Sequence, residues 1–104
     1  MEVTFFDEEI EIFLTKLKKS TIAKVLRTID LLERFGNQLG MPHSKHIGNK
    51  LFELRIRGHQ EIRLFYIFNN NGAVILHGFI KHSQKIPKKE LAVVQQKLIS
   101  FDRI

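Results

Sequence analysis

Basic and polar side chains stand at the margins of apolar segments in the second half of the chain. Arg55 alternates with apolar residues, Arg63 interrupts an apolar run, and Lys81 and His82 close another run shortly before Lys85. The planar fork of an arginine holds a phosphate by two parallel hydrogen bonds. Histidine exchanges a proton near neutral pH. Residues of these types, gathered in one place, would suit the binding of a phosphodiester and a proton transfer beside it.

If the ligand is RNA, the chemistry that these residues can support is attack of a 2′-hydroxyl on the adjacent phosphate. That reaction needs a base at the hydroxyl, positive charge near the transition state and an acid for the leaving 5′-oxygen. We predict that Arg55, Arg63 and Lys81 supply the charge and that His82 is the best placed acid or base. No carboxylate pair is spaced for this work. Tyr66 shares the phase of apolar neighbours and is expected in the core.

A structural role for each arginine stays open. Arg63 can pair with Glu53 or Glu61 across strands, an interaction that contributes a few tenths of a kcal/mol. This explanation suffices for one arginine but not for the whole set, because residues 43–89 carry 9 basic and 2 acidic side chains.

The charge of the 104-residue chain, formally +6, is concentrated in that middle segment. Residues 1–42 have a net charge of −1, residues 43–89 of +7 and residues 90–104 of 0. A basic surface of this kind either is simply solvated or binds a polyanion, and nucleic acid is the polyanion that we favour. The basic residues around the patch, which are Lys45, Lys50, Arg57, Lys85 and Lys88, are predicted to bind RNA.

Several other classes of protein are excluded or not expected. The chain has no cysteine, so disulfide scaffolds, thiolate metal sites and cysteine nucleophiles are ruled out. His43 and His46 are three residues apart, but they lie in a Gly/Pro-containing stretch without nearby carboxylates, so we expect neither a metal site nor a cofactor. His77 is expected to be a hydrogen-bonded core histidine and His59 a turn residue. No apolar run approaches the ~20 residues of a membrane span, and we expect a cytoplasmic protein.

The elements that must position these residues follow from hydrophobic periodicity. Helical spacing predicts helices over 8–18, from Ser20 to Gly36, and from Pro87 onward. Alternation predicts strands over 50–57, 61–68 and 73–80, with a short edge strand at 3–6. The glycines between residues 36 and 49 predict a long loop, and Asn69–Gly72 predicts a hairpin turn.

This order predicts one α+β domain over residues 1–104, arranged β-α-α-β-β-β-α. A helical hairpin packs on one face of a mostly antiparallel, four-stranded sheet, and a helix ends the chain. Arg55 and Arg63 are expected together on the sheet face that the hairpin leaves open, with Lys81 at a strand end.

The sequence also resembles a known family. The stretches Lys50-Leu-Phe-Glu-Leu-Arg55, Ile62-Arg63-Leu-Phe-Tyr66 and Ile75-Leu-His-Gly-Phe-Ile-Lys81 are similar to the phage-derived HigB-like branch of the RelE/ParE toxin superfamily. The closing Lys81-His-Ser-Gln-Lys85-Ile-Pro87 and the loop Pro42-His-Ser-Lys45-His-Ile resemble that branch as well. The resemblance covers nearly the whole chain. It implies a RelE-like fold and the toxin of a type II toxin–antitoxin pair, whose RelE-type members cleave mRNA on the ribosome without a metal.

Carried over by position, the resemblance implies that Arg55 is a basic site residue, that Arg63 contacts the scissile phosphate, and that Lys81 with His82 forms the basic end of the last strand. Several relatives have a catalytic Tyr or His near the C-terminus, where this chain has Phe101. An alternative is a ParE-like, non-enzymatic inhibitor of DNA gyrase, and a third possibility is an inactive remnant kept for regulation. The resemblance also implies a cognate antitoxin, expected to carry a helix-turn-helix domain that links the complex to operator DNA. Its acidic or amphipathic segment would cover the basic face or displace the last helix.

Overall fold

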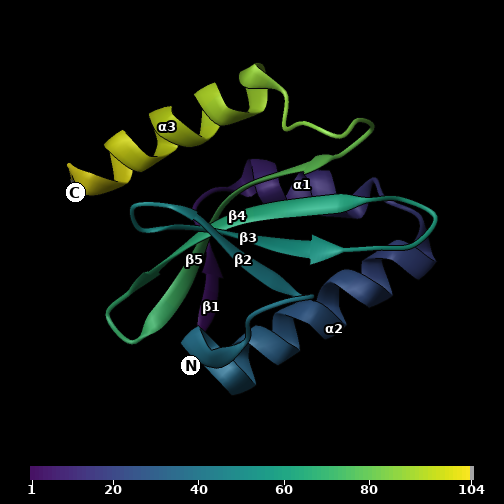
Figure 1. Ribbon diagram of the computed structural model, residues 1–104, viewed down its shortest axis with the longest axis horizontal. Helices are drawn as coiled ribbons and strands as arrows, with labels where there is room; N and C mark the ends of the chain where they lie inside the picture. Colours follow the sequence, from purple (N-terminus) through teal and green to yellow (C-terminus); the bar gives the residue numbers. More distant parts are fainter. Residues whose placement is uncertain (104) are drawn as a thin grey trace.

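The computed structural model describes residues 1–103, which form five strands and three α-helices arranged as in Figure 1. The strands are β1 (Val3–Phe5), β2 (Ser44–Gly48), β3 (Leu51–Ile56), β4 (Ile62–Asn69) and β5 (Gly72–Ile80). The helices are α1 (Glu8–Thr15), α2 (Lys19–Phe35) and α3 (Lys88–Asp102), and a short 3₁₀ helix, η1, spans Gly36–Gln38. The predicted α+β class and the broad element order are therefore confirmed.

The strands form one mixed sheet in the order β1-β5-β4-β3-β2. The three pairings among β2, β3, β4 and β5 are antiparallel, and β1 joins the edge of β5 in parallel. The predicted four-stranded sheet is wrong in number because residues 44–48, expected to lie in a loop, form the edge strand β2. β2 has no regular alternation of apolar residues. It is a strand because its backbone pairs with β3, and an edge strand of a sheet can be polar in sequence.

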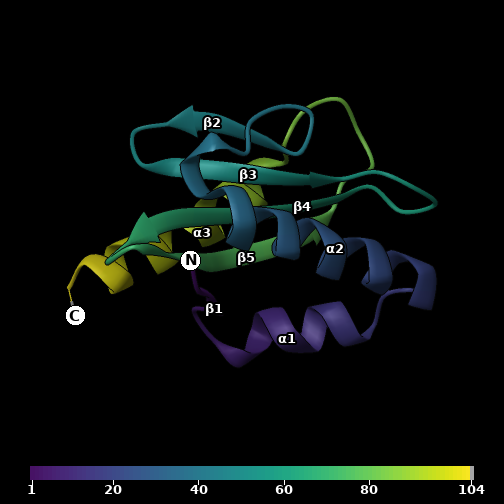
Figure 2. The ribbon, with the colours of Figure 1, turned by 90° about the horizontal axis from the view of Figure 1, so that it is seen from below.

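The two faces of the sheet carry two separate cores. On one face, the residues of β3 and β4 that are in phase with Leu54 and Leu64 pack against Ile10, Val25 and Leu32 of α1 and α2. On the other face, residues including Phe65 and Phe79 pack against α3. Figure 1 shows α2 and α3 on opposite sides of the sheet, and Figure 2 shows α2 in front of the strands with α3 behind them.

The predicted helix and turn boundaries agree with the structure apart from small shifts. α1 ends at Thr15 rather than at residue 18. α2 begins at Lys19, and Lys18 rather than Ser20 occupies the N-cap. The Asn-rich hairpin turn is confirmed, since Asn70 and Asn71 have φ angles of 49° and 63°, which asparagine tolerates better than most residues. No helix among residues 1–103 is long and apolar enough to cross a membrane.

Tyr66 belongs to the core, as its phase predicts. It is 1% exposed, and its hydroxyl and that of Ser44 on β2 form a hydrogen bond of 2.6 Å. Burial raises the pKa of Tyr66 above its ordinary value of 10.0, and the hydrogen bond with Ser44 partly offsets that rise.

We expect the phenol of Tyr66 to ionise at a higher pH in the folded protein than in the unfolded chain. As the pH rises, the phenol therefore loses its proton first in the unfolded state. Below about pH 10 this ionisation does not change the free energy of unfolding, and between about pH 10 and the pKa of the folded protein it lowers that free energy. The protein has a single tyrosine and no tryptophan, so phenolate absorbance reports this residue alone. Ser44→Ala should raise the midpoint further, and a folded midpoint at or below that of the denatured chain would contradict the expectation.

Candidate functional site

The two arginines singled out in the sequence lie directly opposite each other in the sheet. In the antiparallel register of β3 and β4, Arg55 faces Arg63 and Glu53 faces Phe65. Since Phe65 belongs to the core beneath α3, the alternation of side chains places Glu53, Arg55 and Arg63 on that same face. The expectation that Arg55 and Arg63 share a face is confirmed, and it is the face opposite to α1 and α2.

A buried carboxylate lies between these two arginines. Oε1 of Glu53 lies 3.1 Å from Nε of Arg55 and 3.6 Å from Nε of Arg63. Nη1 of Arg63 also contacts Oε2 of Glu61 at 2.9 Å. Glu53 and Arg63 are each 2% exposed. Two like charges placed directly across a strand pair repel each other, so the carboxylates of Glu53 and Glu61 are what allow this register.

The cluster is not saturated with hydrogen bonds. Among residues 1–103, Oε2 of Glu53 and Nε of Arg63 are buried without a hydrogen-bond partner. A buried carboxylate oxygen in this state retains its capacity to accept a hydrogen bond. Oε2 of Glu53 therefore keeps an unused acceptor position inside the cluster.

A hollow opens above this cluster, between the strands and the start of α3. It has a volume of about 330 Å³. Its charged lining consists of Glu53 and four basic residues, which are Lys45 from β2, Arg55 from β3, and Lys81 and Lys85 from the segment that follows β5. We call this the sheet hollow. Cations exceed carboxylates in its lining, so its electrostatic character suits an anion such as a phosphate.

A second hollow adjoins the first and contains the predicted histidine. It has a volume of about 430 Å³ and is lined by Arg57, Glu61, Arg63, Lys81, His82, Ser83 and Gln84. We call this the outer hollow. Lys81 and Gln84 line both hollows, so His82 lies next to the sheet hollow rather than in it.

The segment after β5 is held in place by hydrogen bonds. The amide of Lys81 donates to the carbonyl of Glu61 at 2.7 Å, which extends the pairing of β4 with β5 by one residue. The hydroxyl of Ser83 donates to the carbonyl of Lys85 at 2.9 Å. These contacts define where the backbone carries Lys81 and His82 beside the cluster of arginines.

The remaining predicted site residues lie elsewhere. Lys50, in the turn between β2 and β3, pairs with Asp102 of α3 at 2.5 Å. Lys88 is the exposed first residue of α3 and lies outside the lining of both hollows. Phe101, where the resemblance leads one to expect a proton-transfer residue, packs against the core beneath α3, and its ring centroid lies 6.4 Å from that of Phe6.

The histidines outside the site have structural surroundings. Nε2 of His77 lies 2.9 Å from Oε1 of Glu90, so the expectation of a hydrogen-bonded histidine is confirmed. His46 stacks on Phe52 with ring centroids 4.8 Å apart and contacts the carbonyl of Asn49. Within residues 1–103, no three His, Cys, Asp or Glu side chains are grouped in a way that could hold a metal ion.

Glu53 is the site residue whose importance the sequence did not reveal. Its alternation with Arg55 places both on one face, and that signal is visible in the sequence. Its burial is not, because it depends on the pairing of β2 and β4 with the two sides of β3. The arrangement can bind an anion, hold the arginines without rearrangement, and offer the ring of His82 and the carboxylate of Glu61 for proton transfer.

The class of protein defined by this fold and site is a small α+β protein with a cationic hollow on one sheet face. A family described as "Phage derived protein Gp49-like (DUF891)" matches residues 12–98, which is most of the chain. The protein belongs to this family, which is RelE/toxin-like. No curated protein matches the sequence.

We expect Glu53→Gln to destabilise the fold by about 3 kcal/mol, because an isosteric neutral amide removes the one buried carboxylate that both arginines share and leaves the buried Arg63 with only the partly exposed Glu61. Glu61→Gln is the matched control, since the side chain of Glu61 is 38% exposed and an exposed pair contributes less than about 1 kcal/mol. Urea unfolding followed by circular dichroism measures both. Equal losses of unfolding free energy in the two variants would show that Glu53 is not the central partner.

Proposed function

We propose that this protein is the toxin of a type II toxin–antitoxin system, of the HigB-like branch, and that it cleaves mRNA on the ribosome. The observation that carries the proposal is the sheet hollow, in which Lys45, Arg55, Lys81 and Lys85 surround a buried carboxylate in a chain of a RelE/toxin-like family. Action on the ribosome places the protein in the cytoplasm.

In this proposal the basic residues of the sheet hollow bind the scissile phosphate. The side chain of Arg55 is 17% exposed, and its Nε donates a hydrogen bond to Glu53. Its Nη1 contacts Sδ of Met41 at 3.7 Å, a weak acceptor that a phosphate would replace. Lys81 approaches from the end of β5. Charges that are already oriented stabilise the transition state without reorganisation at the moment of reaction.

Arg63 has a different part in this proposal from the one that the resemblance implies. It is 2% exposed and pairs with both Glu53 and Glu61, so contact with a phosphate would require it to leave these partners. We assign Arg63 the role of a positioning residue that holds Glu53, and through Glu53 also Arg55.

Proton transfer is assigned to His82, with the ribosome supplying the remaining group. His82 is exposed and lies beside Lys81 in the outer hollow, so a phosphate bound in the sheet hollow would lie close to its ring. The proposed reaction is attack of the 2′-hydroxyl on the phosphate, with departure of the 5′-oxygen, and it uses no metal or cofactor.

A cognate antitoxin is part of the proposal. An acidic or amphipathic segment of that partner would neutralise the sheet hollow by covering it or by displacing α3, and a helix-turn-helix domain would connect the complex to operator DNA. The excess of cations in the hollow is the feature that an acidic segment would complement.

We expect Arg55→Ala and Lys81→Ala each to reduce mRNA cleavage by a factor on the order of 10², the loss typical of removing one group that stabilises a transition state. Primer extension on cellular mRNAs during expression measures cleavage, and circular dichroism verifies folding. Lys16→Ala is the matched control, because Lys16 is exposed and lies outside both hollows.

Two outcomes would contradict the proposal. Wild-type cleavage in both variants would show that the sheet hollow is not the site. Growth arrest with DNA damage and continuing translation would instead indicate the ParE-like inhibition of DNA gyrase.

A further inference from the structure

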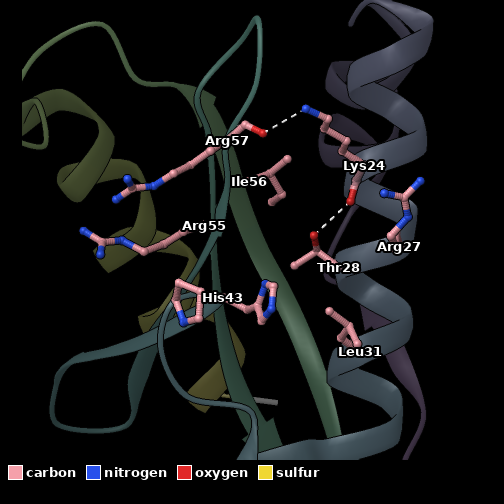
Figure 3. Close-up of a pocket in the computed structure, with 9 residues that line it drawn as sticks. Lys24, Arg27, Thr28, Leu31, His43, Arg55, Ile56 and Arg57 are labelled. Atoms are coloured by element: carbon pink, nitrogen blue, oxygen red, sulfur yellow. Dashed lines mark hydrogen bonds between the residues drawn. The ribbon is translucent and has the colours of Figure 1, made fainter.

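A third pocket lies on the opposite side of β3, between that strand and α2 (Figure 3). It has a volume of about 300 Å³. We call it the helix-side pocket. From α2, the pocket is bordered by Lys24, Arg27 and Leu31. From the other side it is bordered by Arg55, in β3, and by Arg57, which directly follows β3.

The lining of this pocket combines basic residues with apolar and aromatic ones. Its basic residues are Lys24, Arg27, Arg55 and Arg57, of which Arg55 and Arg57 turn their guanidinium groups away from α2, and among residues 1–103 no acidic residue lines it. Leu31 supplies apolar surface and the ring of His43 supplies a flat one, while Ile56, 2% exposed, belongs to the core beneath the pocket. In Figure 3 the His43 ring extends from its own segment into the space between β3 and α2.

The charges that α2 brings to the pocket are not neutralised within the described chain. Nζ of Lys24 donates a hydrogen bond to the carbonyl of Arg57 at 3.2 Å, which orients the ammonium group but leaves its charge uncompensated. In the portion of the chain covered by residues 1–103, Arg27 takes part in no side-chain hydrogen bond or ion pair. A negatively charged ligand that binds Lys24 and Arg27 would therefore not have to displace a carboxylate of the described chain.

The helix-side pocket shares lining residues with the two hollows of the candidate site. Arg55 lines both this pocket and the sheet hollow, and Arg57 lines both this pocket and the outer hollow. Figure 3 shows the guanidinium groups of Arg55 and Arg57 pointing away from α2, while the backbone that carries them borders the pocket. One basic surface thus continues from the α3 side of the sheet around β3 to α2.

We propose that the helix-side pocket is a second RNA-binding site, which takes a nucleotide at a distance from the scissile bond. Lys24 and Arg27 bind its phosphate, and its base lies against Leu31 and the ring of His43. Unpaired bases of RNA are recognised by such apolar and flat surfaces, and basic residues track the backbone. The inference rests on the proposed function, because it takes RNA as the polyanion that the continuous basic surface binds. The nucleotide belongs either to mRNA or to ribosomal RNA, which share this chemistry.

The salt dependence of binding tests the proposal. Each phosphate contact to a single strand contributes a slope of about 0.7 in the plot of log affinity against log salt. We expect Arg27→Ala and Lys24→Ala each to lower the slope by about that amount. Arg27→Lys, which keeps the charge, and Lys16→Ala, which removes an exposed charge outside the pocket lining, should leave the slope at its wild-type value.

Two probes distinguish the sources of the nucleotide. The first is a short fluorescein-labelled single-stranded RNA carrying 2′-O-methyl groups, which prevent cleavage, and its binding is read by anisotropy. The second is purified ribosomes without mRNA, and binding is read by sedimentation. A slope change with the short RNA assigns the pocket to mRNA, whereas a change with ribosomes alone assigns it to ribosomal RNA; either supports the proposal.

Wild-type slopes for Arg27→Ala and Lys24→Ala with both probes would overturn it. A second outcome would also overturn it: polyglutamate binds at this pocket, while Arg27→Ala and Lys24→Ala leave RNA binding unchanged. The pocket would then bind an acidic protein segment rather than RNA. Failure here is separable from failure of the proposed function. If the wild-type protein still cuts mRNA while the slopes are unchanged, the second site alone is refuted. If the wild-type protein cuts no mRNA, the proposed function is refuted whatever the slopes show.

Discussion

The placement of Arg55 directly opposite Arg63 is the constraint on which the candidate site depends. Two guanidinium groups on neighbouring strands repel each other, and burial of Arg63 would be costly without a counter-ion. The carboxylate of Glu53, 2% exposed and close to both, meets this constraint. Its presence lets the sheet retain a surplus of positive charge at one end of a face whose other end is an ordinary apolar core.

The two faces of the sheet differ because the helices cover them to different extents. α1 and α2 cover one face with a continuous core, whereas α3 covers only the part of the other face that is rich in phenylalanine and leucine. The strand ends that α3 leaves uncovered carry the basic residues of the sheet hollow. Because β3 is next to the edge of the sheet, Arg55 and Arg57 border surfaces on both sides of it, which connects the site to α2.

Much of the fold could be predicted from hydrophobic periodicity, because each phase marks a buried face. The alternation in β3 and β4 places Arg55 and Arg63 on one face, and the phase of Tyr66 places it in the core, as the structure confirms. The strand β2 could not be predicted in this way, since a polar edge strand is defined by its partner rather than by its own pattern. The ion pair of Lys50 with Asp102, which are 52 residues apart in the chain, is not predicted by the sequence around either residue.

The sequence by itself determined which residues are basic, which strand face each occupies and which family the chain resembles. These properties are local, because they depend on residue type and on spacing along one segment. Only the tertiary structure decided that Glu53 is buried between two arginines, that His82 lies beside the sheet hollow, and that Lys24 and Arg27 join β3 around a common pocket. These properties depend on distances between segments far apart in the chain, which packing and strand register set.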